Sequence, residues 1–250
     1  MKNFFLAFWL FISSQSLIAQ PKTSDYILGY GGISLVIGSE LLKSHIGPEK
    51  SVWEKPNEFD LFFRDHLKWN DDNLQTASML SDVLAKGIAV PSVFWTPLLT
   101  DHKYGDQLLL NVQVLAATGL LVNSFKFILP RKRPYSFFGS SKSEGKVDNF
   151  SFFSGHAAFP FAVSTSACYL LQKEYPHQSG LIWTGSLLFS ATSGYLRIAA
   201  DKHYMSDVLA GMIIGGFTGY WITKAQSKKF FKEAHAEPSI PMIFNLSYQM

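Results

Sequence analysis

The sequence predicts an all-α protein, a helical bundle of about six core helices that is embedded in a membrane or associated with one. Hydrophobic residues make up 47% of the 250-residue chain, and they concentrate in long stretches. None of these stretches alternates apolar and polar residues with a period of two, so helices are favoured over strands. Each is about 16–24 residues long, which brackets the length that a helix needs to cross a bilayer. The stretches are 26–42, 76–99, 107–125, 156–172, 180–196 and 207–223.

Polar residues interrupt three of the stretches and leave the membrane question open. Glu40 lies in the first stretch, Asp82 and Lys86 lie in the second, and Asn111 and Gln113 lie in the third. Helices that pack around one another in a globular core have a similar composition. The apolar stretches alone therefore do not establish that the helices span a bilayer.

The N-terminus has the layout of an export signal. Lys2 gives a positive start, an apolar run follows at 4–12, and a region of polar and small residues ends at Ala19. We expect a signal peptide at 1–19 and a single helical domain at 20–250. An uncleaved anchor is the alternative, although the apolar run is short for a span. The expected location is the cell membrane with periplasmic or extracytoplasmic association, and a soluble periplasmic or secreted form is the alternative.

The connections between the stretches give conflicting orientations. A cleaved signal places residue 20 outside, and six spans then place the 130–153 loop inside, where its basic residues suit the cytoplasm. The basic tail after 224 would then lie outside, although basic connections usually lie on the cytoplasmic side. Three explanations of this conflict stay open. One stretch does not span, or the signal is retained, or the whole fold is soluble or only membrane-associated. The connection 43–75 mixes charges with Trp and Phe, which indicates an amphipathic segment at an interface.

Composition excludes several classes of site. The net charge of +3 is too small for the basic face that a nucleic-acid partner requires. Cys168 is the only cysteine, so an internal disulfide and a cysteine-based metal site are both excluded. We expect no metal and no nucleic-acid partner.

Three polar clusters lie at the ends of apolar stretches, in the segments KFILPRKRP, FSFFSGH and LRIAADKHYMSD. Taken singly, each has a structural explanation: a basic flank of a span, a helix N-cap beside a chance histidine, and a polar linker that caps the next helix. Three such clusters in this order, each at a helix end, favour a shared function. Their members are Lys126, Arg133, Ser154, Gly155, His156, Arg197, His203 and Asp207.

Five of these residues form a candidate site for an anion. Lys126, Arg133 and Arg197 supply positive charge, and a guanidinium fork is suited to phosphate oxygens. Gly155 lets the backbone come close to a ligand where a helix begins with its N–H groups pointing outward. Ser154 adds a hydroxyl donor.

Two histidines and a carboxylate complete the set. One histidine can attack phosphorus while the other protonates the leaving oxygen. His203 and Asp207 are four residues apart, so their side chains share one face of a helix. We expect Asp207 to hold one ring nitrogen of His203 and to leave the other with its lone pair.

In these segments the sequence resembles the superfamily of type 2 phosphatidic acid phosphatases and vanadium haloperoxidases, on its phosphatase branch. The resembling pattern is Lys-x6-Arg-Pro, then Ser-Gly-His, then Arg-x5-His-x3-Asp, within an acid phosphatase/haloperoxidase-like helical domain. The resemblance implies that His203 is a nucleophile that forms a phosphohistidine, that Asp207 orients it and that His156 is the general acid. The implied phosphate-binding set is Lys126, Arg133, Ser154, Gly155 and Arg197.

Two positions depart from the family's pattern. Phe153 precedes Ser-Gly-His where proline is usual, and Leu196 precedes Arg197 where serine is usual. Neither the usual proline nor the usual serine carries a charge or donates a proton in the family's mechanism. We expect the departures to affect rate or substrate choice.

The resemblance implies a phosphatase that hydrolyses phosphate monoesters or pyrophosphates and needs no cofactor. The expected substrates are lipids such as phosphatidate, phosphatidylglycerol phosphate, isoprenyl pyrophosphate or lipid A. A secreted, soluble, non-specific acid phosphatase acting on small phosphate esters is the alternative. A vanadate haloperoxidase is less favoured because that branch has much longer chains. A membrane protein that only holds an anionic headgroup would have little reason to contain both histidines and Asp207.

Overall fold

The computed structural model describes residues 21–53 and 55–231. The predicted signal peptide, 1–19, lies outside the described residues. The described part is helical and contains no strand, only an isolated bridge between Arg131 and Phe150. The prediction of an all-α bundle is confirmed.

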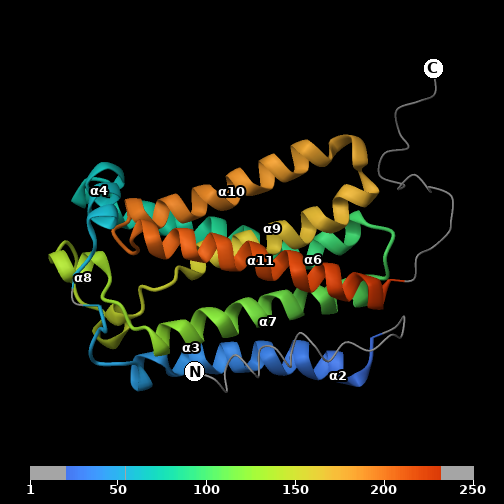
Figure 1. Ribbon diagram of the computed structural model, residues 1–250, viewed down its shortest axis with the longest axis horizontal. Helices are drawn as coiled ribbons and strands as arrows, with labels where there is room; N and C mark the ends of the chain where they lie inside the picture. The colour runs from blue at the N-terminus through green and yellow to red at the C-terminus, as the bar shows by residue number, and fades with distance from the viewer. Residues whose placement is uncertain (1–20, 54, 232–250) are drawn as a thin grey trace.

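Six long helical segments run along the long axis of the molecule (Figure 1), and each contains one of the predicted apolar stretches or most of it. The first two are composite, because short 3-10 or π turns join their α-helices. The segments are α2 (Thr23–Tyr26) with η1 (Ile27–Gly31) and α3 (Gly32–Ile46); η2 (Asp71–Asn73) with α5 (Leu74–Asp82), η3 (Val83–Ala89), α6 (Ser92–Trp95) and η4 (Thr96–Leu99); α7 (Tyr104–Ile128); α9 (Gly155–Glu174); α10 (Ser179–Ala199); and α11 (Met205–Phe230).

Short elements lie in the connections. The longest is α4 (Glu58–Leu67), which lies within the connection predicted to be amphipathic, and it exposes Phe59 and Phe62. The others are α8 (Pro134–Phe138), η5 (Gly145–Asn149) and η6 (Pro176–Gln178). Figure 1 shows α4 and α8 together at one end of the bundle.

Close packing of α9 against α11 forms the centre of the bundle. A Cβ on Gly215 would lie 2.1 Å from the carbonyl oxygen of Ala158, and a Cβ on Gly219 would lie 2.1 Å from that of Ala162. Only glycine fits at these two positions, because a methyl group there would overlap the opposite backbone. The spacing of four residues keeps both glycines on one face of α11. The two helices therefore lie nearly in backbone contact.

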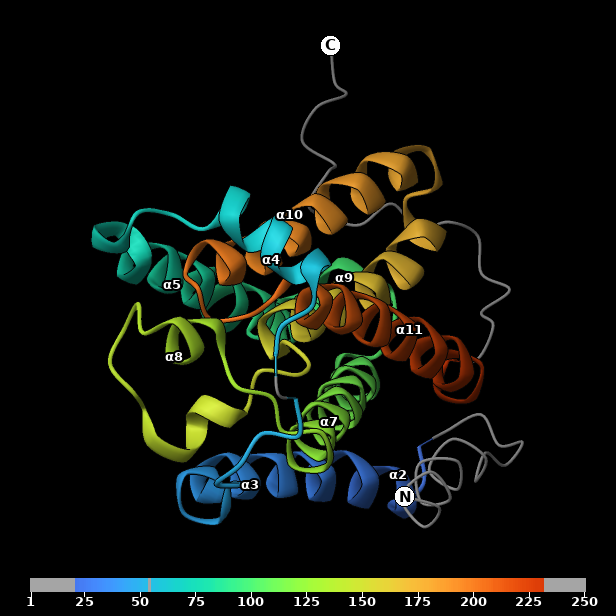
Figure 2. The same ribbon diagram turned by 60° about the vertical axis from the view of Figure 1, so that its left-hand side comes forward.

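The helix α7 packs between α3 on one side and α9 and α11 on the other (Figure 2). Within the described residues, α7 and the composite segment Asp71–Leu99 are the two that are long and apolar enough to cross a membrane, by length and composition. The share of the apolar window that is buried is 72% in α7 but only 28% in Asp71–Leu99. The composite segment therefore offers an apolar outer surface that the fold itself does not cover.

Candidate active site

The fold brings the three polar clusters to the same end of the bundle. The C-terminal ends of α7 and α10 and the N-terminal ends of α9 and α11 lie at this end, near α8 (Figure 1). The backbone N–H of Ser154 donates to the carbonyl oxygen of Asp207 at 3.0 Å, which ties the start of α9 to the start of α11. The backbone N–H of His203 donates to the carbonyl oxygen of Arg197 at 3.2 Å. That bond folds the third cluster into a tight turn.

Most of the predicted site residues are buried in spite of their polarity. The fraction exposed is 8% for both Lys126 and Arg133, 5% for Arg197, 2% for His203, and zero for Ser154 and Asp207. His156 is more open, with 17% of its side chain exposed. Lys126, Arg133, Arg197 and His156 are all near enough to His203 for their charges to act on it.

Three hydrogen-bond donors of the site are buried without a partner in the protein. They are Nε of Arg133, Oγ of Ser154 and Nε of Arg197, from a total of five such side-chain atoms in the described part of the chain. Buried polar groups are nearly always hydrogen-bonded, so unpaired donors mark a place where a ligand supplies the acceptors. Two guanidinium groups and a hydroxyl suit a tetrahedral oxyanion.

The described residues include no group of three or more His, Cys, Asp or Glu that could hold a metal ion. Positive charge at the site comes from the side chains of Lys126, Arg133 and Arg197.

A backbone carbonyl fixes the ring of His203. The carbonyl oxygen of Ser151 lies 2.8 Å from Nδ1. Because a carbonyl can only accept, Nδ1 carries the proton and Nε2 retains its lone pair. Burial lowers the pKa of His203 well below its ordinary value, and the charges of Arg133 and Arg197 lower it further. The ring is therefore neutral at neutral pH and has the tautomer that a nucleophile requires.

Asp207 does not hold the imidazole directly, and here the structure differs from the expectation. Its Oδ2 lies 3.8 Å from Nδ1 of His203, beyond hydrogen-bond distance. Oδ2 instead accepts from Oγ of Ser151 at 2.6 Å and from the backbone N–H of Tyr204 at 2.9 Å, and Oδ1 accepts from Arg131 at 2.6 Å. Asp207 therefore caps α11 and anchors Ser151, the residue whose carbonyl oxygen holds the ring of His203.

Arg131 is a residue that the sequence analysis did not separate from its basic neighbours. Its guanidinium lies 2.6 Å from Asp60 of α4 and 2.6 Å from Asp207, and both carboxylates are completely buried. The same group lies over the rings of Trp53 and Tyr204, at 4.7 Å and 4.2 Å from their centroids. Arg131 is thus a structural cation that joins α4 to the start of α11.

Asp82 is a second residue whose role the sequence analysis missed. Its Oδ1 lies 2.5 Å from Nε2 of His156, 3.1 Å from Nζ of Lys86 and 3.8 Å from Arg197. The available signal was a carboxylate inside an apolar stretch. That signal could not name His156 as the partner, because the two residues lie on different helices and 74 positions apart.

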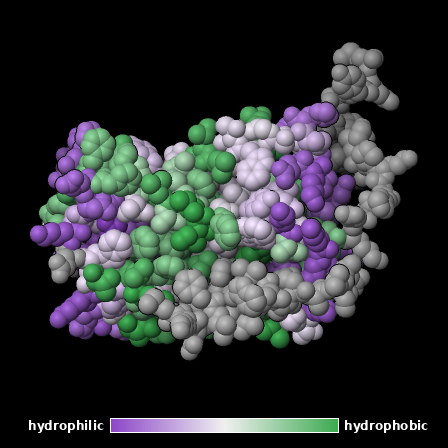
Figure 3. All heavy atoms as spheres, viewed as in Figure 1, coloured by the Kyte–Doolittle hydropathy of each residue, from purple (hydrophilic) through white to green (hydrophobic). Residues whose placement is uncertain are grey.

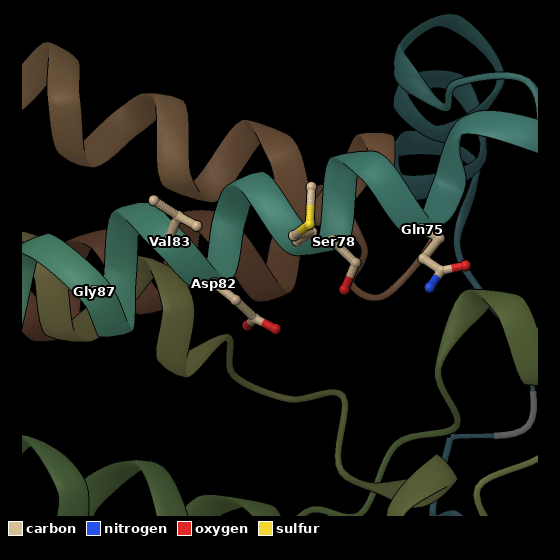
Figure 4. A pocket seen from close by; sticks show the side chains of 6 residues that line it. Gln75, Ser78, Asp82, Val83 and Gly87 are labelled. Carbon is tan, nitrogen blue, oxygen red and sulfur yellow. The ribbon is translucent and has the colours of Figure 1, made fainter.

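An open groove lies beside this pair on the outer face of α5 and η3. It has a volume of about 470 Å³ and is lined by Gln75, Ser78, Met79, Asp82, Val83 and Gly87. Figure 4 shows the polar groups of Gln75, Ser78 and Asp82 on the same side of the helix. Arg197 donates to Oγ of Ser78 at 3.3 Å, so the groove contacts one member of the predicted phosphate-binding set.

The two departures from the family pattern fill apolar space. Phe153 is completely buried, and its ring lies 5.5 Å from that of Phe125. Leu196 is buried in a cluster with Ala77 and Ala199, so it joins α10 to α5. Both residues contribute packing at the positions where the pattern usually has proline and serine.

Comparisons with known proteins agree with the helical bundle. The PAP2 superfamily matches residues 107–231 of the 250-residue chain, a range that contains all three clusters. The chain belongs to the PAP2 superfamily.

Two similar proteins have names that describe phosphatases of lipids. The chain is 32% identical over 123 residues to a lipid A 1-phosphatase of Porphyromonas gingivalis; the match covers 48% of this chain and 24% of that protein. The chain thus spans only about a quarter of that relative's length. A crystal structure of a transmembrane PAP2-type phosphatidylglycerolphosphate phosphatase from Bacillus subtilis superposes with a TM-score of 0.57 at 19% identity, covering 80% of this chain and 97% of the other. At that identity the likeness concerns the fold.

Proposed function

We propose that the protein is a membrane-bound phosphatase that releases inorganic phosphate from phosphorylated lipids through a phosphohistidine. The observation that carries this proposal is the set of buried, unpartnered donors on Arg133, Ser154 and Arg197. They lie beside a neutral histidine whose lone pair is free. Because three cations supply the charge neutralisation, the proposed chemistry needs no metal.

In the first step, Nε2 of His203 attacks the phosphorus atom of the bound ester. A P–N bond forms while the bond between phosphorus and the leaving oxygen breaks, and its electron pair passes to that oxygen. His156 gives its ring proton to the same oxygen, so the product leaves as a neutral alcohol. Lys126, Arg133 and Arg197 stabilise the charge on the three equatorial oxygens.

In the second step, water releases the phosphate. His156, now neutral, takes a proton from water as the water oxygen attacks phosphorus. The P–N bond breaks, its electron pair returns to Nε2 of His203, and inorganic phosphate leaves. The sum of both steps is hydrolysis of one ester to one alcohol and one phosphate, with both histidines restored.

Two negative groups support the proton that His156 donates in this scheme. The carboxylate of Asp82 lies 2.5 Å from Nε2 of His156. A bound phosphate dianion adds a second negative charge beside the ring, and nearby opposite charges favour the imidazolium.

The surface of the bundle supports a membrane location and a lipid substrate. Figure 3 shows hydrophobic residues gathered in the middle of the face in view, with hydrophilic residues toward both ends. Isolated exposed apolar residues are ordinary, but a large apolar patch is typical of a contact surface. The names of both similar proteins also point to lipid phosphates. Exposed side chains on the outer helices include Leu35, Leu41, Val83, Ile88, Leu188, Ile213, Phe217 and Trp221.

The phosphatase proposal is tested with purified protein in detergent and no added metal. The panel contains phosphatidate, phosphatidylglycerol phosphate, a lipid A 1-phosphate, isoprenyl pyrophosphate and p-nitrophenyl phosphate, with inorganic phosphate as the readout. His203→Ala should lower release at least about 10³-fold. His177→Ala is the matched control, because His177 is exposed in η6 at the opposite end of the bundle. Near-normal turnover by His203→Ala would reject the nucleophile.

The location proposal has its own measurements. We expect the protein to stay with membranes after a carbonate wash. Recovery in the soluble fraction would favour the non-specific acid phosphatase instead.

We also propose that 1–19 direct export and that 20–250 form one domain. The expected result is a mature N-terminus at residue 20.

A further inference from the structure

The turn between α10 and α11 sets two side chains of the proposed site relative to each other. It begins at Arg197, in the last turn of α10, and ends at His203, before the first residue of α11. The backbone N–H groups of Lys202 and His203 both donate to the carbonyl oxygen of Arg197, at 3.0 Å and 3.2 Å. The conformation of these few residues therefore fixes the position of the nucleophile relative to one guanidinium of the proposed phosphate-binding set.

Asp201 lies in this turn in an unusual backbone conformation. Its φ is 57°, and in the described part of the chain it is the only residue other than glycine with a positive φ. This left-handed region is unfavourable for a residue with a Cβ, whereas glycine adopts it freely. The side chain of Asp201 is also completely buried. Because glycine would avoid both the strain and the buried charge, the presence of the carboxylate indicates that it has a role of its own.

Arg64 of α4 binds this carboxylate with two hydrogen bonds. Its Nε lies 2.7 Å from Oδ1 of Asp201, and its Nη2 lies 2.9 Å from Oδ2. Only 13% of the Arg64 side chain is exposed, and its guanidinium lies 3.8 Å from the ring centroid of Phe138. The hydroxyl of Ser140 donates to Oδ2 as well. A two-point contact of this kind fixes the orientation of the carboxylate as well as its distance, so it holds the turn in place.

The same face of α4 also holds the chain on the other side of His203. Asp60 lies one helical turn before Arg64, so the two side chains lie on one side of the helix. The carboxylate of Asp60 accepts from the backbone N–H and from the hydroxyl of Ser206, each at 2.8 Å. Contacts from α4 thus reach positions 201 and 206, which bracket His203.

We propose that Arg64 is a positioning residue for the phosphatase reaction, and that it acts by holding Asp201 and thereby the turn from Arg197 to His203. This role rests on the proposed function and requires no contact between Arg64 and the substrate. The turn acts on the phosphoryl group, which all phosphate esters share. Loss of Arg64 should therefore lower kcat by a similar factor for esters with different leaving groups.

Arg64→Met is the first test of this role. It should lower kcat about 10–100-fold for both phosphatidylglycerol phosphate and p-nitrophenyl phosphate, because a displacement of about 1 Å in a site has an effect of this size. The rate is taken per folded molecule, with thermal unfolding in detergent as the measure of folding. Asp65→Asn is the matched control, because it removes an exposed carboxylate that lies 3.9 Å from the same guanidinium. It should keep kcat within about twofold of the wild type, since an exposed ion pair contributes little.

A second variant, Arg64→Lys, covers the case in which Arg64→Met fails to fold. Lysine keeps a positive charge beside the buried carboxylate of Asp201 but cannot make the two-point contact. The loss of thermal stability should therefore be smaller than in Arg64→Met. Because the orientation of the carboxylate is no longer fixed, kcat should still fall about threefold to tenfold for both esters.

A double-mutant cycle shows whether Arg64 acts through Asp201. Asp201→Gly should lower kcat less than Arg64→Met does, because glycine adopts the left-handed conformation without a partner. In the Asp201→Gly background, Arg64→Met should change kcat by less than about twofold, since the contact that it breaks is already gone. The same cycle can be made with Arg64→Lys.

Several results would overturn the positioning role. A folded Arg64 variant with a lowered unfolding temperature and the kcat of the wild type would show that Arg64 only stabilises the fold. Additive losses in the double variant would show that Arg64 does not act through Asp201. A loss confined to one of the two esters would assign Arg64 to the leaving group. A wild-type protein that releases no phosphate from any ester would instead reject the phosphatase function itself.

Discussion

His203 and His156 lie at the same end of the bundle, yet they are held in different ways. His203 is 2% exposed, and a backbone carbonyl fixes its ring. The side chain of His156 is 17% exposed, and its partner Asp82 has 43% of its side chain exposed. One histidine belongs to a closed network in the interior, and the other meets the open groove on α5.

The difference separates the constant part of the proposed reaction from its variable part. In that reaction every phosphate ester presents the same phosphoryl group to His203, so a buried environment serves all substrates. The leaving alcohols differ in size and chemistry, and they depart on the side of His156. An open wall there can take different alcohols without altering the nucleophile.

The largest expected effect comes from the buried network around His203. Arg131→Met leaves the buried carboxylates of Asp60 and Asp207 without their cation, which should lower the free energy of unfolding by about 3–5 kcal/mol and abolish phosphate release. Denaturant unfolding in detergent measures the change. Lys132→Met is the control, because its side chain is exposed next to Arg131. Equal stability of the two variants would contradict the role of Arg131 in the His203 network.

The next largest effect concerns Asp82, the partner of His156, as a residue that positions His156. Asp82→Asn should lower kcat for an alkyl phosphate about 10–100-fold, because the acid must protonate a poor leaving group. Turnover of p-nitrophenyl phosphate should fall far less, because p-nitrophenolate leaves without a proton. Asp72→Asn, at an exposed position, is the control. A loss of the same size with both substrates would show that Asp82 only supports the local structure, and Asp82→Glu should restore part of the alkyl-phosphate rate.

The sequence predicted the parts of the molecule that depend on local pattern. The length of the apolar stretches and their lack of a two-residue alternation predicted the six helical segments. The position of each polar cluster at the end of a stretch predicted that the clusters share a function. The partners of His203 and His156 were not predictable in the same way. The Ser151 carbonyl is a backbone group with no sequence signature. Asp82, at the end of α5, reaches His156 because α5 packs against α10 and η3 packs against α9.

The expected hydrogen bond between Asp207 and His203 is not formed, for a related reason, although their side chains lie 3.8 Å apart. Spacing places two side chains on one helical face only when both lie on the helix, and His203 precedes the first residue of α11, Met205. Asp207 is in the first turn, where unpaired backbone N–H groups compete for its carboxylate. Arg131, from another connection, takes the remaining oxygen.

A smaller effect is expected in the pH dependence. Burial, together with Arg133 and Arg197, lowers the pKa of His203, so the ring keeps its lone pair as pH falls below 6.5. An ordinary histidine would be only about a tenth neutral at pH 5.5. We therefore expect kcat/KM for p-nitrophenyl phosphate at pH 5.5 to remain above about half of its value at pH 7. An acidic limb centred near pH 6.5 would show that His203 is as easily protonated as a histidine in water.

A last variant decides how the ring of His203 is held. Ser151→Ala removes the hydroxyl that donates to Asp207 but keeps the carbonyl that accepts from Nδ1. If the carbonyl is the direct constraint, kcat should fall less than about twofold, and the free energy of unfolding should fall by about 1.5–3 kcal/mol for one lost hydrogen bond to a charged acceptor. Phosphate release and denaturant unfolding measure the two quantities on the same preparation. A loss as large as that of His203→Ala, with little change in stability, would instead assign the orientation of the nucleophile to the hydroxyl and Asp207.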